Sequence, residues 1–317
     1  MYLQLLCTKA YKSVGASVRL QQLATVALAK DPLAISTPFT SLTMQRQSAS
    51  TRGRSSPPFQ LPRTLVRPPF TEVSRAALLA ASPDLGNVSL DVVLKNLLAT
   101  APQMLAGSSA LSPSHLPSAL PKANLPPYLT IPLRRLQASV QPSYPTHALA
   151  ISTASSAGAD THLIFAVHAL VLAAHCSKLP QLPPPAPRTN ASVHLPVLPI
   201  SLPSAPAFAI LHAFMYTHRL DAVLSALFPV PPQFVRALTH KAVCAALQSG
   251  ADLHHLSAHL CAASAANVQV LMTHTAHVKE LWQDMVALGV NDTELWDTVE
   301  LAYEIVLGAL NLAVMTK

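Results

Sequence analysis

Asp160-Thr-His-Leu-Ile-Phe-Ala-Val-His168-Ala-Leu-Val-Leu-Ala-Ala-His-Cys176 is the most informative stretch of this sequence. β-Branched and aromatic residues dominate Thr161–Val167, which predicts a strand. The helix-forming alanines and leucines of Ala169–Cys176 predict a short helix directly after it. His147–Ser152 has the same apolar character as the first segment and predicts a second strand upstream. The stretch therefore indicates a mixed α and β core.

The segments that follow continue this mixture. A proline-rich break at Pro180–Pro187 precedes an apolar segment, Val193–Ile200, that we expect to be extended. Two helices are predicted next, at Ala205–His218 and at Leu220–Leu227, and Pro229 ends the second.

The last 85 residues contain no proline, whereas all 29 prolines lie at or before Pro232. Apolar residues at helical spacing predict four helices here. The expected ranges are 233–248, 252–263, 268–289 and 291–310.

Residue types that start or stop helices set these boundaries. We expect Gly250 to stop the first helix, Asp252 to cap the second, and Asn291 with Glu294 to form a capping box for the fourth. The acidic residues of the last helix are expected on a solvated face: Glu294, Asp297, Glu300 and Glu304.

The N-terminal part is basic. Residues 1–75 carry ten Lys or Arg against two acidic residues, whereas the remaining 242 carry eleven against twelve. We expect a disordered basic arm at 1–74, which could touch nucleic acid only weakly, through non-specific phosphate contacts. Residues 1–30 also have the basic, acid-free composition of a mitochondrial transit peptide. Ser55 and Ser56, between arginines and Pro57, are candidate phosphorylation sites.

The arm is followed by a helical pattern and then by prolines. Apolar spacing predicts helix within 71–107, with Ser89 as an N-cap. Eight prolines break residues 108–146, which we expect to be loops wrapped over the domain, with room for a short element only at 129–140. The predicted organisation is 1–74, 75–146, 147–230 and 231–317.

The overall composition excludes several classes of protein. Half of the residues are hydrophobic and 11% are charged, which is not typical of a fully disordered chain. The longest uncharged stretch, Thr189–His218, is interrupted by prolines, and the longest apolar run, Leu163–Ala174, is shorter than the ~20 residues of a membrane span. We therefore expect no membrane partner. Four scattered cysteines favour a reducing compartment, the nucleus or cytoplasm, with the mitochondrion as the alternative.

Catalytic motifs are missing from the sequence. It contains no GxSxG, GxGxxG or GxxxxGK[ST] pattern, so we expect neither enzyme activity nor a cofactor. Fourteen histidines leave a metal alternative: His255 and His259 are four residues apart, with Cys261 nearby. No CxxC or HExxH motif supports it, and metal ligation remains the weaker interpretation. Two further pairs have helical spacing, His240 with Cys244 and His274 with His277.

The opening stretch resembles the core of BTB/POZ domains, in which an Asp precedes a strand, an aromatic lies in it and a His opens the next helix. Asp160, Phe165 and His168 stand at these positions. The second half of the resemblance is a proline-containing segment that leads to Phe208 and a helix that ends near Tyr216. The resemblance implies a fold signature, not a site.

Residues 125–147, Leu-Pro-Pro-Tyr-Leu-Thr-Ile-Pro-Leu-Arg-Arg-Leu-Gln-Ala-Ser-Val-Gln-Pro-Ser-Tyr-Pro-Thr-His, are similar to the clampless-type proteins of basidiomycete fungi. The similarity extends from about Ser89 to the C-terminus. It implies a regulator of sexual development that controls clamp-cell formation and the dikaryon cell cycle through protein partners, downstream of homeodomain mating-type factors. It brings no catalytic residues.

The fold class expected is α+β and helix-rich: a degenerate BTB/POZ-like module, an all-helical C-terminal extension and the N-terminal arm. The function expected is non-enzymatic binding of transcription factors or cell-cycle regulators. An apolar groove between the BTB-like helices and residues 233–317 is the candidate surface. The alternatives are a BTB-type substrate adaptor of a ubiquitin ligase, and a zinc-binding domain or hydrolase that uses the C-terminal histidines.

Overall fold

The computed structural model describes residues 62–134, 141–153, 161–185, 189 and 191–315. Residues 64–317 belong to one compact unit, and the description below concerns this unit. The predicted arm, its transit-peptide alternative, the Ser55 and Ser56 phosphorylation sites and Asp160 lie outside the described residues.

A five-stranded mixed sheet forms one layer, in the order β1-β4-β3-β5-β2. The strands are β1 (Ala119–Pro121), β2 (Tyr128–Pro132), β3 (His147–Thr153), β4 (Thr161–Val167) and β5 (Ser192–Leu202). β3 pairs antiparallel with β4 and parallel with β5, because the chain crosses over through a helix before β5 begins. The predicted strands at 147–152 and 161–167 and the extended segment 193–200 are confirmed.

The edge strand β1 corrects the prediction that its part of 108–146 is loop, whereas β2 overlaps 129–140, where the sequence leaves room for a short element. β1 pairs with β4, and β2 pairs with β5 so that Ile131 lies opposite Val193. Ile131 is fully buried in a cluster with Leu195, Ala148 and other strand residues. β2 ends in proline, which the edge of a sheet tolerates because one side of an edge strand needs no ladder hydrogen bonds. Proline density therefore concealed β1 and the pairing of β2.

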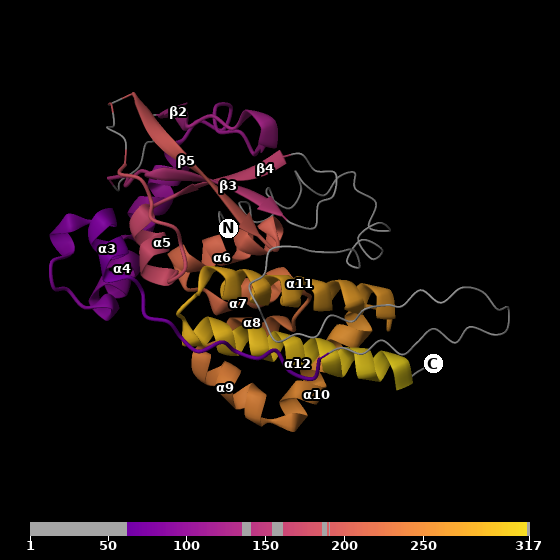
Figure 1. Ribbon diagram of the computed structural model, residues 1–317. Helices are drawn as coiled ribbons and strands as arrows, with labels where there is room; N and C mark the ends of the chain where they lie inside the picture. The colour runs from indigo at the N-terminus through magenta and orange to yellow at the C-terminus, as the bar shows by residue number, and fades with distance from the viewer. Residues whose placement is uncertain (1–61, 135–140, 154–160, 186–188, 190, 316–317) are drawn as a thin grey trace, which may run out of the picture. The chain divides into compact units, whose positions relative to one another are not determined.

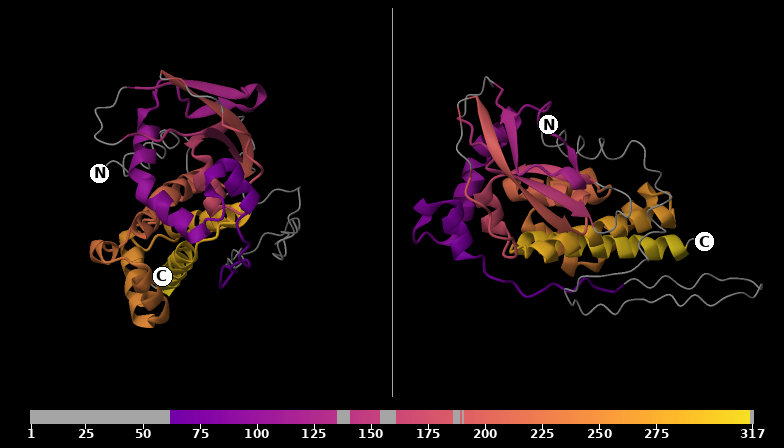
Figure 2. Two further views of the ribbon diagram at one scale, coloured as in Figure 1. Left: turned by 90° about the vertical axis from the view of Figure 1, so that its left-hand side faces the viewer. Right: turned by 45° about the horizontal axis from the view of Figure 1, so that its top comes forward.

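Helices cover one face of the sheet. α5 (Ala169–His175) and α6 (Ala205–Thr217) lie between the sheet and the C-terminal helices, as Figures 1 and 2 show. α3 (Arg75–Ala81) packs on α5, and α4 (Leu90–Ala110) packs on α5 and α6. Pro83 and Gly86 separate α3 from α4, where a helical pattern is predicted across 71–107. Ser89 occupies the N-cap position of α4 without a side-chain hydrogen bond to the helix.

The C-terminal region is helical, as predicted, and α12 (Thr293–Met315) is its central element. It packs against α7 (Leu220–Leu227), α9 (His240–Gln248), α10 (Gly250–Ala263) and α11 (Val268–Leu288). The predicted fold class, α+β and helix-rich, is thereby confirmed at this level.

The predicted helix 233–248 is wrong as one element. It divides into α8 (Pro232–Arg236) and α9, and Thr239 caps α9 by accepting a hydrogen bond from the amide of Ala242. The Thr239 hydroxyl accepts a hydrogen bond from an amide of the first turn of α9, which has no partner within the helix. A new helix therefore begins at this point, and α8 does not continue into α9.

Two other predicted boundaries are displaced by one to three residues. Ser249 caps α10 by accepting from the amide of Asp252, and Gly250 opens that helix rather than stopping the previous one. Asp292, not Asn291, accepts from the amide of Leu295 at the start of α12. Several neighbouring polar side chains could accept hydrogen bonds from the unpaired amides of the first helical turn. The backbone geometry of the turn decides which of them does so. Gly289 ends α11 with φ +64°, as predicted.

Backbone hydrogen bonds join the sheet region to the C-terminal helices. The amides of Ser177 and Lys178, after α5, donate to the carbonyls of Gly289 and Leu288 at 3.0 Å each. The amide of Asn291 donates in return to the carbonyl of His175 at 3.2 Å. These bonds hold the end of α5 against the turn between α11 and α12.

α12 has the length and composition of a membrane span. Its most apolar 18-residue window has a mean hydropathy of 1.5, but 56% of that window is buried inside the fold. Acidic residues interrupt its first half, so this helix does not stand out as an uncharged run in the sequence. A core helix passes the same test, so α12 is weak evidence for a membrane.

Candidate functional site

His168 and Tyr216 connect the two halves of the sequence signature. The Tyr216 hydroxyl accepts from the His168 amide at 3.1 Å and donates to His168 Nδ1 at 2.8 Å. His168 Nε2 donates to the carbonyl of Ser143 at 3.1 Å. Each ring nitrogen thus has one partner, which selects the neutral tautomer. Burial lowers the pKa of His168 to about 4, despite the opposing effect of the Ser143 carbonyl.

The aromatic signature residues meet in the same place. Phe165 of β4 packs edge-on against Phe208 of α6, with ring centroids 5.0 Å apart. His212 lies against Phe165, Phe208 and Tyr216. Burial, followed by the nearby His168, lowers the pKa of His212 to about 4. These side chains form a closed packing cluster without an exposed reactive group.

A pair of histidines, His175 and His218, lies at the C-terminal end of α5. His175 Nδ1 donates to the carbonyl of Val171 at 2.8 Å, and His175 Nε2 accepts from His218 Nε2 at 3.0 Å. Burial lowers the pKa of His175 to about 4. His218 Nδ1 lies 3.7 Å from a carboxylate oxygen of Asp292. The pair ties α5 and α6 to the start of α12.

The thiol next to this pair is unsuited to nucleophilic attack. Burial raises the pKa of Cys176 to about 12, and its Sγ faces the sulfur of Met215 at 4.0 Å. A thiol that stays protonated is inert. Exposed hydroxyl–histidine contacts occur elsewhere in this region: His115 Nδ1 lies 3.1 Å from the Ser112 hydroxyl and 3.0 Å from that of Ser114, at the surface after α4.

The predicted metal candidates His255, His259 and Cys261 do not form one site. All three lie on α10, but His255 is exposed, His259 is half-buried and Cys261 is buried. Successive helical residues turn by about 100°, so Cys261 points about 200° away from His259. The sequence spacing brought the two histidines to one face and left the thiol on the other.

A different group converges between α9 and α12. His240 Nε2 donates to a carboxylate oxygen of Asp297, Oδ2, at 2.7 Å, and Cys244 Sγ lies 3.4 Å from that nitrogen and 3.9 Å from that oxygen. His240 and Cys244 were among the spacings noted in the sequence, whereas Asp297 was expected to be solvated. Its side chain is only 17% exposed.

Arg67 completes the surroundings of this group. Its guanidinium bonds the other oxygen of Asp297, Oδ1, and lies 3.3 Å from Glu300. Burial raises the pKa of Asp297, but the hydrogen bonds from His240 and Arg67 outweigh it, so the pKa lies below its ordinary value. No pattern in the sequence indicates Arg67 or Asp297, because they come from segments 230 residues apart.

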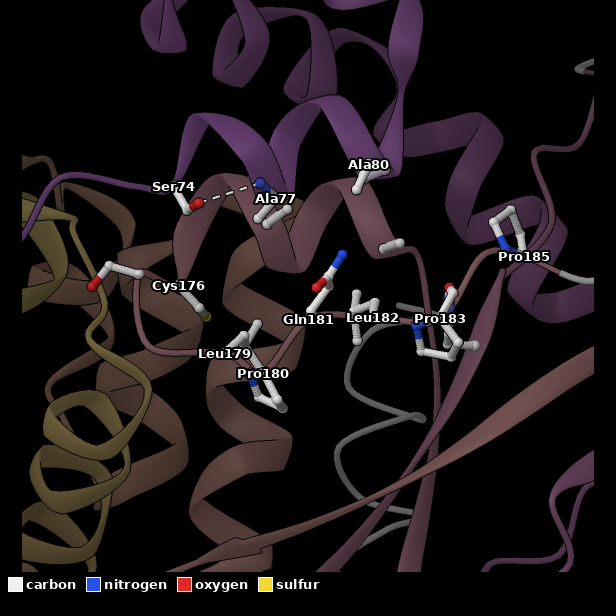
Figure 3. A pocket seen from close by; sticks show the side chains of 15 residues that line it. Ser74, Ala77, Ala80, Cys176, Leu179, Pro180, Gln181, Leu182, Pro183 and Pro185 are labelled. Atoms are coloured by element: carbon white, nitrogen blue, oxygen red, sulfur yellow. Dashed lines mark hydrogen bonds between the residues drawn. The ribbon is translucent and has the colours of Figure 1, made fainter.

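The proline-rich segment after α5 lines an apolar pocket. Figure 3 shows Ala77 and Ala80 of α3 above Leu179–Pro183, with Cys176 at one end. The pocket holds about 40 Å³, room for little more than a water. His147 Nε2 donates to the Pro183 carbonyl at 2.8 Å and fixes the segment there. The proline-rich segment Leu179–Pro183 therefore covers this side of α3 and α5.

A larger, open hollow lies between α8 and α10. It measures about 280 Å³ and is bounded by apolar and polar side chains. The lining residues are Pro231, Gln233, Phe234, Asp252, His255 and Leu256. All of these residues belong to the C-terminal region, so the hollow differs from the groove expected between the BTB-like helices and residues 233–317.

The fold and these sites define an α+β, helix-rich protein whose α/β region buries His147, His168 and His175. Comparison with protein families gives two matches: the Clampless protein 1 N-terminal domain at residues 68–203 and the Clampless protein 1 C-terminal domain at 221–317. The chain belongs to the Clampless protein 1 family, as the sequence resemblance indicated. This membership implies a role in clamp connection formation. Neither a curated protein nor a solved structure matches the chain.

Proposed function

We propose that this protein acts in clamp connection formation as a non-enzymatic interaction module. It binds transcription factors or cell-cycle regulators of the dikaryon, in the nucleus, the cytoplasm or both. The observation that carries the proposal is the pair of family matches, which together span the sheet region and the C-terminal helices. Enclosed histidines and an inert Cys176 thiol support a binding role over a catalytic one.

The α/β region is proposed to be a degenerate BTB/POZ-like module. Its support is the placement of the signature residues: Phe165 within β4, His168 at the start of α5, and Phe208 and Tyr216 on the helix after β5. The hydrogen bonds between His168 and Tyr216 join the two halves of the signature across the fold. This module provides a rigid platform for the C-terminal helices.

The hollow between α8 and α10 is the proposed contact surface for a regulatory protein. It is open, and Phe234, Pro231 and Leu256 offer apolar contact area beside the polar side chains of Gln233 and His255. Apolar surface flanked by polar groups is typical of protein interaction sites.

A complementation experiment tests the proposal. The full chain, or the variant Gln233→Glu/His255→Asp, is expressed in a mated strain that lacks the protein, and clamp connections are scored. We expect the wild type to restore clamps and the variant to fail, because burying two unpaired carboxylates under an apolar partner surface costs desolvation free energy. Gln269→Asp, an exposed change on α11, is the matched control and retains function.

Affinity purification from the same cells identifies the partner class. Recovery of a transcription factor or cell-cycle regulator by the wild type, and its loss with the hollow variant, supports the proposal. Recovery of a cullin instead would favour the ubiquitin ligase adaptor. Loss of binding only when residues 1–61 are removed would contradict the assignment to the folded region. A fluorescent tag on the full chain tests the nuclear or cytoplasmic location against the mitochondrion.

A further inference from the structure

His240, Cys244 and Asp297 present three different ligand atoms to one point. His240 and Cys244 are four residues apart on α9, so both face α12, and Asp297 faces them from the second turn of that helix. Imidazole nitrogen, thiolate sulfur and carboxylate oxygen are all ligands of zinc. The three candidate ligand atoms lie within 4.8 Å of one another.

The spacing of these atoms is close to that of a tetrahedral metal site. Metal–ligand distances of about 2.0–2.3 Å and tetrahedral angles place ligand atoms about 3.4–3.6 Å apart. The observed separations are 3.4 Å from Sγ to Nε2, 3.9 Å from Sγ to Oδ2 and 2.7 Å from Nε2 to Oδ2. Side-chain shifts of well under 1 Å would open the last pair and admit an ion.

The neighbouring charges orient two of the ligands. Glu294 Oε1 lies 3.8 Å from His240 Nδ1, on the far side of the ring from Cys244 and Asp297. A carboxylate at this nitrogen favours the tautomer that leaves Nε2 free for a metal. Arg67 occupies Oδ1 of Asp297, so Oδ2 remains turned toward the histidine and the thiol. Glu300 partly balances the charge of Arg67.

The partial burial of the group also suits a metal site. The side chains of His240 and Asp297 are 33% and 17% exposed, so an ion could enter from solvent while most of the carboxylate stays enclosed. Three protein ligands leave a fourth position for water. α9 packs on α12, and this contact keeps the two helices in register for all three ligands.

We propose that His240 Nε2, Cys244 Sγ and Asp297 Oδ2 bind a divalent transition-metal ion of the zinc class at the contact of α9 and α12. The ion takes its fourth ligand from solvent, and binding releases the thiol proton to bulk water. The proton that His240 Nε2 donates to Asp297 before the ion binds moves through solvent to Nδ1, which faces Glu294. It holds α9, the N-terminal part of α12 and the Arg67 segment together. This inference does not rest on the interaction function proposed above.

Cobalt titration of the metal-stripped full chain tests the proposal. Tetrahedral Co²⁺ with a thiolate ligand gives a charge-transfer absorption in the near ultraviolet, so the band reports sulfur ligation directly. We expect one Co²⁺ per chain to develop this band and one equivalent of Zn²⁺ to abolish it. Absence of the band in the wild type would overturn the proposal.

Substitutions assign the ligands. Cys244→Ser should abolish the band and weaken Zn²⁺ binding by about 100-fold or more, and Glu294→Gln should weaken it by about 10-fold through the histidine. Cys261→Ser and His255→Ala are matched controls on α10 and should leave both readouts within about twofold, since these side chains point elsewhere. A band that survives Cys244→Ser, or that Cys261→Ser removes, would contradict the assignment.

A measurement on the unaltered protein covers the case in which Cys244→Ser does not fold. Alkylation of each cysteine by iodoacetamide is followed by peptide mass spectrometry, with and without one equivalent of Zn²⁺. We expect zinc to slow modification of Cys244 by about 10-fold or more, because a metal-bound thiolate is a poor nucleophile, and to leave Cys261 unchanged. Equal rates at Cys244 with and without zinc would refute the site.

Discussion

The α/β region and the C-terminal helices use histidine in opposite ways. In the first, His168 and His175 are buried, neutral and bonded to carbonyl or neutral side-chain partners. In the second, His240 is one-third exposed and faces a carboxylate and a thiol. The difference teaches that a histidine count says nothing about chemistry until the partners of each ring are known.

α6 belongs to both regions and lies between the two family matches. It packs on α4 and α5 on one side and on α7 and α11 on the other. Its N-terminus is held from the helical region: the amide of Ser204 donates to Asp284 of α11 at 3.0 Å, and the Ser204 hydroxyl donates to Glu280 at 2.8 Å. The two regions therefore share a helix, and we expect them to unfold together.

Phe208→Ala should lower stability more than any other change proposed here, because it disrupts the packing of α6, the helix that the two regions share. The side chain is fully buried and packs edge-on against Phe165 of the sheet. Loss of a buried phenylalanine costs about 3–5 kcal/mol, so the free energy of unfolding should fall by this amount. Urea unfolding measures the loss, and hydrogen exchange should rise in both β4 and α11. Increased exchange in β4 alone would show that the regions unfold separately. Phe208→Leu serves as the milder control.

The pH dependence of stability should differ in sign between three buried histidines, His168, His175 and His212, and the buried carboxyl of Asp284. The pKa of His168, His175 and His212 lies near 4 in the fold and near 6.5 in the unfolded chain, so the unfolded state binds more protons below pH 6.5. Stability should be lost as pH falls from about 6.5 towards 4, by about 2 kcal/mol per histidine at pH 5.

Asp284 of α11 acts in the other direction. Burial raises its pKa to about 8, so the folded state binds the extra proton between the ordinary carboxyl pKa and pH 8. Its contribution is full at low pH and is lost as pH rises through that range. Stability measured by urea unfolding should therefore be greatest near pH 6–7.

The isosteric variant Asp284→Asn separates these two effects. It should be more stable than the wild type at pH 8, by about 3 kcal/mol, because the buried charge is gone while the amide oxygen still accepts from Ser204. The loss towards pH 5 should remain in the variant. If the free energy of unfolding of the wild type falls no more steeply with rising pH than that of Asp284→Asn, the raised pKa of Asp284 is contradicted.

Tyr216→Phe tests the closed hydrogen-bond cluster of the α/β region. The change removes only the hydroxyl that bonds the amide and Nδ1 of His168. An unsatisfied buried amide costs about 1–3 kcal/mol, so thermal unfolding should shift downward accordingly. Tyr128→Phe, at an exposed tyrosine of β2, is the control and should change nothing. Equal shifts in thermal unfolding for the two changes would show that the hydrogen bonds from Tyr216 to His168 contribute no more to stability than an exposed hydroxyl does.

Thr239→Ala should have the smallest effect and stay local to the helical region. The threonine hydroxyl caps α9 through the amide of Ala242 at 3.3 Å. Loss of an N-cap costs about 1 kcal/mol, and amide exchange should rise in α9 while β3 and β4 keep their protection. Thr273→Ala, at a half-buried threonine within α11 whose hydroxyl bonds the Gln269 carbonyl of its own helix, is the control. Faster exchange in the sheet would show that α9 supports more than its own contact with α12.

Much of the fold could be predicted from residues 147–227 alone. Alternating and continuous apolar runs located β3, β4, α5, β5, α6 and α7, because buried elements of this length leave a clear period in the sequence. The signature residues Phe165, His168, Phe208 and Tyr216 were also found in advance. Their contacts were not, since spacing reveals which residue types are present and not which partner each will meet.

The sequence by itself determined the class of fold, the helical C-terminal region and the family resemblance, because these depend on local pattern and residue type. Only the tertiary structure decided that β1 and β2 extend the sheet, since edge pairing depends on a distant partner strand. It also decided that Asp297 meets His240 and Cys244 instead of solvent. Helix packing sets which face of α12 is covered, and no local pattern contains that information.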